Sequence, residues 1–478
     1  MTWSPCGKPM KAFSIFLTSL FTVLFVAEVS LAATYYVSTN GKDSNPGTDA
    51  APWRTVSKAA QMLQPGDTVY IKGGTYAEQV IPARSGLAGS EITYAAYPGE
   101  VPVLDGQTLS ITDPDWGGLF LIKDKSYIRV LGLKIQNSAS ISGSPGIAGI
   151  LVTSSDNIVI ENNITLNTRS SGIGVWDSTH VRVIANDVQK AVNGGSQECI
   201  TVANSSYFEV TQNQVHNGCG LDPGGEGINI KQMCAFGTVH HNSVYDLPGE
   251  VALYVDAYSS MAPGNHDIKV YNNTVHDVWL GIAIGAEQGG HVQDVQVFNN
   301  LVHHTKSQGI LVTDWMGSDE GTKKNIALFN NTVVANGSGG YGGGLSIESS
   351  RIENISVYNN ILSDNLAWQF RVNTAGESHV SGTHNLIYGP NDYVEGSLRS
   401  ITGSYAVVGK NPLLISATDF HLQPNSPALD SGCSGAAPAS DFDGIPRPQG
   451  SGYDIGAYEY VSADKSPPSS PTGVKIIN

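Results

Sequence analysis

A lysine and two carboxylic acids in the middle of the chain could together act on a sugar polymer. The residues are Lys231, Asp256 and Glu226. A lysine amine can remove the proton next to a uronate carboxylate, after which the 4-linked sugar is eliminated. Two carboxyl groups roughly 5 to 9 Å apart can instead hydrolyse a glycosidic bond. These three residues are therefore the candidate catalytic groups.

Further acids and aromatic residues extend this candidate site. A lyase needs a cation to neutralise the substrate carboxylate, and carboxylate oxygens are the ligands that Ca²⁺ prefers. The candidate calcium ligands are Glu198, Glu226, Asp256, Glu287 and Asp314. The candidate substrate-binding residues, which could offer ring faces or polar groups to sugars, are Trp176, Asn229, Tyr254, Trp315 and Glu348.

Three functions are open on these residues. In a polysaccharide lyase Lys231 is the base, although an ion pair with Asp256 would favour its charged form and weaken it. In a glycoside hydrolase, Asp256 with Glu226 or Glu287 supplies the two carboxyl groups. In a non-catalytic carbohydrate-binding or adhesion protein, Lys231 and Asp256 form an ordinary cross-strand ion pair.

The strands that carry these residues belong to a repeat. Between Ile128 and Leu386, an alternating apolar strand ends in asparagine and precedes a strand of the pattern small, apolar, any residue, apolar. The aligned asparagines are Asn163, Asn186, Asn213, Asn242, Asn273, Asn300, Asn331 and Asn360, and the last three intervals are 27, 31 and 29 residues. Such a period, with room for a third strand, predicts an all-β, right-handed parallel β-helix with an asparagine ladder at one corner.

Alternation along the second strand predicts which side chains point outward. Asn229 and Tyr254 fall in one outward column, and Lys231 and Asp256 fall in the next. Neighbours in a column of a stacked sheet lie about 4.8 Å apart, so Lys231 should lie beside Asp256. The sequence thus predicts a groove whose central patch contains Glu226, Lys231 and Asp256.

The two ends of the chain differ from the repeat. Lys8 and Lys11 precede an apolar run from Ala12 to Val26, which is typical of a secretory signal. The predicted divisions are a signal peptide at 1–33, an N-terminal cap and first coils at 34–106, the β-helix at 107–400, a C-terminal closing module at 401–461 and a Pro/Ser-rich tail at 462–478. Within the cap, a short helix is expected from Trp53 to Leu63. We therefore expect a secreted, extracellular or periplasmic protein with no membrane span after the signal is removed.

The net charge of the chain limits the classes of molecule that it is expected to bind. The 478-residue chain has a formal net charge of −16, which disfavours binding to nucleic-acid phosphates and anionic lipids. An extended polysaccharide is the expected partner, and the protein is expected to be a monomer. Calcium would offset the repulsion between an acidic protein and an acidic polymer.

Two further patterns have alternative interpretations. Cys219 and Cys234 flank a Gly-rich loop and could form a disulfide bond or remain buried thiols. A column of rings could hold a metal ion or form a turn ladder near solvent, and the ladder is favoured. The column is His216, Tyr245, His276 and His303, followed by Asp246, Asp277 and His304.

Both ends of the mature chain resemble known families. The segments YYVSTNGKDSNPGT, PWRTVSKAA and PGDTVYIKGGTY are similar to the entry segment of family 9 polysaccharide lyases. SPALDSG, DFDGIPR and DIGAYE look like a C-terminal module of secreted or surface β-helix proteins. The resemblance implies a member of the pectate-lyase-like superfamily, and it favours the lyase, although the scaffold also carries hydrolases, epimerases and adhesins.

The resemblance does not transfer the family's calcium site. Family 9 lyases bind calcium through aspartates on adjacent coils and use a lysine as base. The stretch from Glu250 to Tyr254 lacks the family's Asp-Asp-Gly-x-Asp. The expectation of Ca²⁺ therefore rests on the separate acids named above.

Overall fold

A computed structural model describes most of the chain after the first 31 residues. The described residues are 32–111, 117–140, 146–218, 225–260, 263–315, 321–372, 375–389, 394–395, 405–435 and 437–462, and all belong to one compact unit. Most of the predicted signal peptide and of the Pro/Ser-rich tail lies outside these residues. Within the described residues, no helix is long and apolar enough to cross a membrane.

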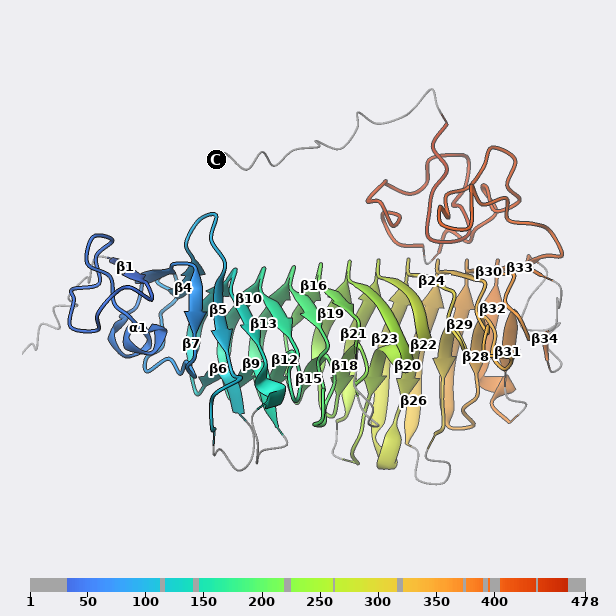
Figure 1. Cartoon of the computed structure of the whole chain (residues 1–478). Helices are drawn as coiled ribbons and strands as arrows, with labels where there is room; N and C mark the ends of the chain where they lie inside the picture. The colour runs from blue at the N-terminus through green and yellow to red at the C-terminus, as the bar shows by residue number, and fades with distance from the viewer. Residues whose placement is uncertain are drawn as a thin grey trace, which may run out of the picture. The chain divides into compact units, whose positions relative to one another are not determined.

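The described chain is a right-handed parallel β-solenoid of about ten turns, as predicted (Figure 1). One sheet has 13 strands: β1 (Thr34–Val37), β2 (Thr68–Ile71), β4 (Ile92–Ala96), β7 (Ser126–Leu131), β10 (Asp156–Glu161), β13 (Thr179–Ile184), β16 (Glu209–Thr211), β19 (Ala235–His240), β21 (Asn265–Tyr271), β23 (His291–Phe298), β26 (Thr322–Phe329), β29 (Ile352–Tyr358) and β32 (Val380–Thr383). These include the strands that end in asparagine in the sequence pattern.

The second sheet has 22 strands in two rows. The first row holds β3 (Gly74–Tyr76), β5 (Pro102–Asp105), β8 (Lys134–Gln136), β11 (Ile164–Leu166), β14 (Asp187–Gln189), β17 (Gln214–His216), β24 (Leu301–His303), β27 (Thr332–Val334), β30 (Ile361–Ser363), β33 (Leu386–Tyr388) and β35 (Val407–Val408). The second row holds β6 (Gly117–Lys123), β9 (Ile147–Thr153), β12 (Ile173–Trp176), β15 (Ile200–Ala203), β18 (Ile228–Lys231), β25 (Ile310–Val312), β28 (Leu345–Ile347), β31 (Phe370–Val372) and β34 (Val394–Glu395). The long strands β20 (Ser243–Asp256) and β22 (Thr274–Gly285) run through both rows.

One coil therefore contains three strands, including the short strand for which the repeat length left room. In the coil of β13, β14 and β15, the residues Val181, Val183, Val188, Ile200 and Val202 are buried. Their alternation with outward residues follows from the two-residue period of a strand. The apolar pattern in the sequence is thus the core of the solenoid.

The predicted asparagine column forms a continuous buried ladder. At Asn273, the backbone N–H and the side-chain amide both donate to Asn300 Oδ1 at 3.0 Å, and the same amide donates to the carbonyl oxygen of Val239 at 3.0 Å. The same pattern links Asn163 through successive coils to Asn385. Each asparagine satisfies backbone groups that the corner of the coil would otherwise bury without partners.

The N-terminal end is capped as predicted by a short helix, α1 (Val56–Met62). The Thr55 side chain accepts a hydrogen bond from the backbone N–H of Lys58 at the helix start. The predicted apolar face, which runs from Trp53 to Leu63, is buried. A cap of this kind covers core that the first coil would expose.

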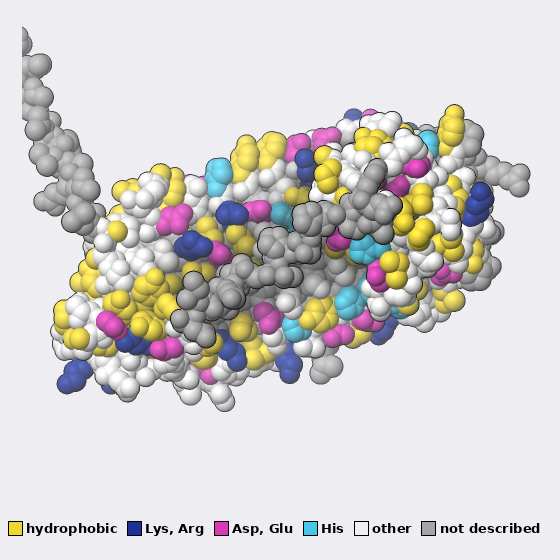
Figure 2. Space-filling model, turned by 90° about the horizontal axis from the view of Figure 1, so that it is seen from above, with side chains coloured by type: hydrophobic (Ala, Val, Ile, Leu, Met, Phe, Trp, Pro, Cys, Tyr) yellow, Lys and Arg dark blue, Asp and Glu magenta, His cyan; other side chains and the backbone are white. Residues whose placement is uncertain are grey.

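Beyond β35, the described C-terminal residues 409–435 and 437–462 form a C-terminal segment that packs against the side of four successive coils (Figure 1). Side-chain amides of a second asparagine column hold its backbone: Asn272 to Phe442 O, Asn299 to Ser440 O, Asn330 to Gly456 O and Asn359 to Cys433 O, at 2.9 to 3.4 Å. Apolar contact is made by Phe420 and Tyr458 with Leu301 and Val334. Figure 2 views this side of the molecule, where histidine and acidic side chains lie close together.

A charged histidine fastens part of this C-terminal segment. His421 lies between Asp419 and Asp443, at 2.6 and 2.9 Å, and its ring stacks on Tyr458. The hydrogen bond to Asp443 is the main cause that raises the pKa of His421 to about 9. A folded-state pKa above the ordinary histidine value of about 6.5 stabilises the fold fully below that pH, and the contribution disappears as the pH rises through 9.

We expect the C-terminal segment to loosen between pH 6 and pH 9.5, because His421 loses its charge over that range. Limited proteolysis at several pH values should show faster cleavage within this segment at the alkaline end. The variant His421→Gln should show little of this pH dependence. An equal pH dependence in the variant would assign the effect to another group.

Candidate functional site

The predicted register of the second strand row is confirmed. Asn229 on β18 is paired with Tyr254 on β20, and Lys231 is paired with Asp256. The next pairing places Asp256 opposite Gly285 on β22. The sequence therefore placed the central groups on adjacent coils correctly.

The ionic partner of Lys231 is Glu198 rather than Asp256. Lys231 Nζ contacts Glu198 Oε1 at 2.7 Å, and no described ion pair joins it to Asp256. Glu198 is nearly buried and also accepts a hydrogen bond from the Thr201 hydroxyl at 2.7 Å. The long lysine side chain thus reaches back across its strand row to the acid that precedes β15. Lys231 and Asp256 are neighbours in the register as predicted, but the ion pair considered as an alternative is formed with Glu198 instead, because register fixes the backbone neighbours and not the direction of a flexible side chain.

Asp256 is a buried acid rather than an open groove residue. It is 3% exposed, and its Oδ1 atom has no hydrogen-bond partner. Burial raises the pKa of Asp256 well above its ordinary value, and repulsion from Glu287 adds to the rise. Asn229, one column away, is also buried with its Oδ1 atom lacking a partner. Two oxygen atoms without partners therefore lie within this part of the site.

Two more acids have a raised pKa. Burial, followed by repulsion from Glu198, raises the pKa of Glu226 to about 7. Glu250, which sequence reasoning did not select, has its pKa raised to about 7 by burial and by repulsion from Glu226. A carboxyl group with such a pKa can give or take a proton near neutral pH.

Tyr254 joins the central acids to the next part of the groove. Its hydroxyl donates to Glu287 Oε1 at 2.8 Å. Tyr254, a predicted sugar-binding residue, is therefore already engaged with the protein, and its side chain is buried. The ring lies over Gly285, where an added Cβ would come within 2.3 Å of the hydroxyl. A side chain at Gly285 would therefore have to displace the Tyr254 hydroxyl.

The predicted calcium ligands do not form a metal site. Asp314 binds the fully buried Lys323 at 2.6 Å and the backbone N–H of Ser350, so it is held outside the central acids. Glu198 and Glu287 also have protein partners. Across the described residues, no group of three or more His, Cys, Asp or Glu side chains is placed to hold a metal ion.

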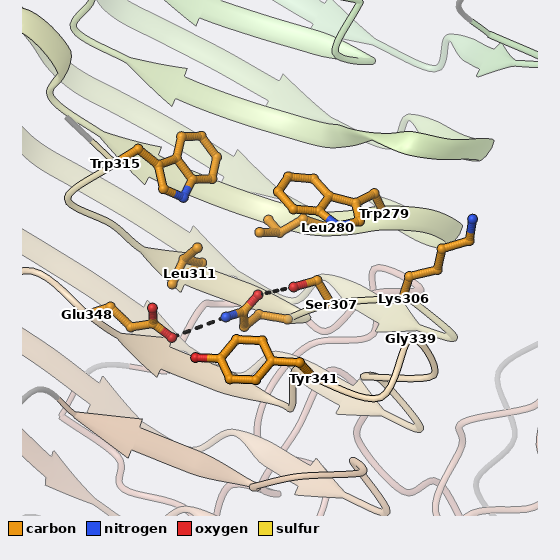
Figure 3. A pocket seen from close by; sticks show the side chains of 10 residues that line it. Trp279, Leu280, Lys306, Ser307, Leu311, Trp315, Gly339, Tyr341 and Glu348 are labelled. Atoms are coloured by element: carbon orange, nitrogen blue, oxygen red, sulfur yellow. Dashed lines mark hydrogen bonds between the residues drawn. The ribbon is translucent and has the colours of Figure 1, made fainter. Parts of the chain in front are cut away.

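The predicted aromatic residues divide between two places. The Trp176 ring lies near Lys231, whose Nζ is 5.6 Å from the ring centroid, and Tyr258 approaches the same Nζ from 6.0 Å. Trp315 and Glu348 instead line a cleft of about 480 Å³ further along the stack, where sequence reasoning missed Trp279 and Tyr341 (Figure 3).

The ring column forms the favoured ladder. His216, Tyr245, His276 and His303 stack with centroids 4.8 to 5.2 Å apart, and Phe420 of the C-terminal segment packs on the last ring. Burial lowers the pKa of His303 to about 4. Neutral imidazoles can stack in this way without a metal ion.

The predicted disulfide is not described, because Cys219 lies outside the described residues. Cys234 is a buried free thiol whose Sγ lies 3.3 Å from the carbonyl oxygen of Lys231. This observation favours the second alternative, buried thiols, for Cys234.

Comparisons with known proteins agree with this architecture. The family model "Pel9A-like, right handed beta helix region" matches residues 35–196, and "Right handed beta helix region" matches residues 171–362. The chain is a right-handed β-helix protein of the pectate-lyase-like superfamily. Its N-terminal part is similar to the Pel9A-like pectate lyases, as the sequence segments implied.

Two curated relatives match different shares of this β-helix protein. The uncharacterized protein YwoF of Bacillus subtilis is 29% identical over 380 residues, which cover 74% of this chain and 79% of the relative. Pectate lyase PEL9 of Emericella nidulans is 30% identical over 175 residues, 34% of this chain and 40% of that enzyme.

Solved structures show the same fold at low identity. Pectate lyase Pel9A has a TM-score of 0.53 at 18% identity and covers 90% of this chain and 97% of its own. The A-module of mannuronan C-5 epimerase AlgE4 from Azotobacter vinelandii has a TM-score of 0.51 at 14% identity, covering 71% and 93%. The superfamily's similar members thus include both lyases and an epimerase.

Proposed function

We propose that this protein is a secreted polysaccharide lyase that cleaves a uronate-containing polymer by β-elimination. The observation that carries the proposal is the placement of Lys231, Asp256 and Glu226 on adjacent coils, with Glu198 beside the lysine amine. The ion pair with Glu198 favours the charged form of Lys231, so the lysine must lose a proton before it can act as the base. The Pel9A-like N-terminal part and the secretory-signal pattern support it.

The proposed reaction uses each central group once. Lys231 passes its proton to Glu198 and then removes the hydrogen from the sugar carbon next to the carboxylate. A double bond forms as the bond to the 4-linked oxygen breaks. Protonated Asp256 donates a hydrogen bond to the substrate carboxylate, and protonated Glu226 gives its proton to the leaving oxygen. The roles of Asp256 and Glu226 agree with their raised pKa values.

The acid role of Glu226 predicts a fall in kcat as the pH rises through about 7, because only the protonated carboxyl can protonate the leaving oxygen. Glu226→Gln should lower kcat by roughly 10²-fold or more and remove this inflection. Steady-state rates from pH 5 to 9 measure both effects. Glu250→Gln is the matched control, because Glu250 has a similar pKa, and this variant should keep the inflection. Loss of the inflection in that control instead would assign it to Glu250.

A glycoside hydrolase is the second candidate. Glycoside hydrolases also use buried carboxyl groups with a raised pKa as acid catalysts, and Asp256 and Glu226 have this property. In such an enzyme Lys231 would not act as a base. Hydrolysis would produce new reducing ends without the ultraviolet absorbance of unsaturated sugar ends.

The discriminating experiment incubates the mature protein with pectate, alginate and neutral glycans, with added Ca²⁺ and with a chelator. Both unsaturated and reducing ends are measured. Unsaturated ends support the lyase, and reducing ends alone support the hydrolase. Neither product on any polymer would contradict both and favour a non-catalytic carbohydrate-binding or adhesion protein. Dependence on Ca²⁺ would show that the cation binds with the substrate, since the described acids do not form a cage for it.

A further inference from the structure

A cleft lined by aromatic residues lies beyond the central acids, toward the C-terminal end of the stack. Leu280 on β22 and Leu311 on β25 form part of its floor, and the Trp279 and Trp315 rings stand beside them, 6.4 Å apart between centroids. Figure 3 shows the two indoles along one side and Tyr341 and Glu348 on the opposite side. Both tryptophans are well exposed, at 38% and 40%. Exposed ring faces above an apolar floor can bind the apolar face of a sugar ring.

Polar groups face these rings. Gln308 donates to Glu348 Oε1 at 3.1 Å, and Arg371 lies 3.8 Å from the same oxygen. Arg371 also donates to the Tyr341 hydroxyl at 2.9 Å, which fixes that ring at the wall. Amide, carboxylate and phenol oxygens in fixed positions are acceptors for sugar hydroxyls. The carboxylate of Glu348 would repel a uronate carboxylate placed against it, whereas Arg371 beside it and Lys306 at the edge of the cleft carry the opposite charge, so binding of neutral and acidic sugars has to be compared directly.

An aromatic contact joins the wall of the cleft to the central site. The Trp315 ring meets the Tyr254 ring edge to face at 5.2 Å, and Tyr254 is the register partner of Asn229. Leu280 lies two strands from Lys231 and Leu311 lies three, which corresponds to roughly 10–14 Å along the stack. A linked pyranose unit has a length similar to one coil spacing, so two or three units would span this separation.

We infer that this cleft is a second sugar subsite, which holds a neutral pyranose unit of the polymer two or three units from the bond cleaved near Lys231. Its distance from the cleavage point rests on the proposed function, whereas sugar binding by the cleft does not. The substrate would then be a mixed polymer, with a uronate at the central acids and a neutral sugar in the cleft.

Binding is tested with neutral hexasaccharides of glucose, mannose, galactose and xylose, and with oligogalacturonate and oligomannuronate. The protein is the full mature chain carrying Lys231→Met and Glu198→Gln, so that no substrate is cleaved. At least one neutral hexasaccharide should quench tryptophan fluorescence and bind by calorimetry. Adding Trp279→Ala or Trp315→Ala should weaken that binding roughly tenfold each. Phe236→Ala is the matched control, because this exposed ring lies outside the cleft and should leave binding unchanged.

Three outcomes would overturn the subsite. They are quenching by the oligouronates alone, no binding of any neutral sugar, or equal binding by the tryptophan variants. A neutral sugar that binds through these tryptophans while the wild-type chain cleaves no polymer would sustain the subsite and contradict the proposed lyase. On a cleaved polymer, the tryptophan variants should raise KM and leave kcat unchanged.

Discussion

Replacing Lys231 with methionine should abolish cleavage of the polymer, with kcat lower by about 10²–10⁴-fold. Methionine keeps much of the length and apolar stem of lysine but has no amine to accept a proton. The formation of unsaturated ends by the purified variant, compared with the wild-type chain, measures the loss. Full retention of activity would remove Lys231 as the base.

This substitution also affects stability, so activity alone is ambiguous. Lys231 and Glu198 are largely buried, and removing one member of a buried pair costs about 3–5 kcal/mol of unfolding free energy. Adding Glu198→Gln removes the charge that is left behind. We expect the double variant to recover most of the lost stability in a urea titration and to remain inactive. Activity that returned together with stability would mean that the pair is structural.

Much of the fold could be predicted because it depends on local patterns. The two-residue alternation in strands such as β13 and the recurring asparagines specify the core and the corner of each coil. Since every coil repeats the alternation and the asparagine, a strand whose own pattern is weak can be placed by alignment with the neighbouring coils. The same repetition fixed the register that places Lys231 opposite Asp256.

The contacts of individual side chains could not be predicted in the same way. Lys231 pairs with Glu198, which lies on the preceding coil five residues before Ala203, the register partner of Lys231. A long, flexible side chain can reach this far from its own register position. Asp314 forms an ion pair with Lys323. The repeat pattern does not align these two residues, so it could not predict the contact. These contacts keep the described acids from forming the predicted calcium cage.

The aromatic cleft was partly visible in the sequence. Trp315 and Glu348 were selected, but Trp279 and Gln308 were not. The residues that precede the small residue of each second-strand pattern form the column Glu198, Glu226, Val251, Leu280 and Gln308. That column changes from acidic to apolar along the stack, and this change is the signal that would have located the cleft. Tyr341 comes from a loop, where the repeat gives no register.

Replacing Asn300 with alanine should destabilise the solenoid by about 3–5 kcal/mol, because several buried backbone and amide groups lose their partners together. Asn300 Oδ1 accepts from the backbone N–H and the side chain of Asn273, and its amide donates to the carbonyl oxygen of Val270 at 2.9 Å. The substitution also removes the donor to Asn331 Oδ1, which breaks the ladder in mid-stack.

Urea unfolding followed by far-ultraviolet circular dichroism measures this loss. Gln296→Ala is the matched control, since Gln296 is exposed on β23 in the same coil and should change stability by no more than about 0.5 kcal/mol. Because each coil of a solenoid packs mainly against its neighbours, the broken ladder should also make unfolding less cooperative, with the C-terminal segment still joining the coils on both sides of the break. If the Asn300→Ala variant unfolded in a single step with the same urea midpoint as the control, the ladder would add little stability. Water would then replace the missing amide.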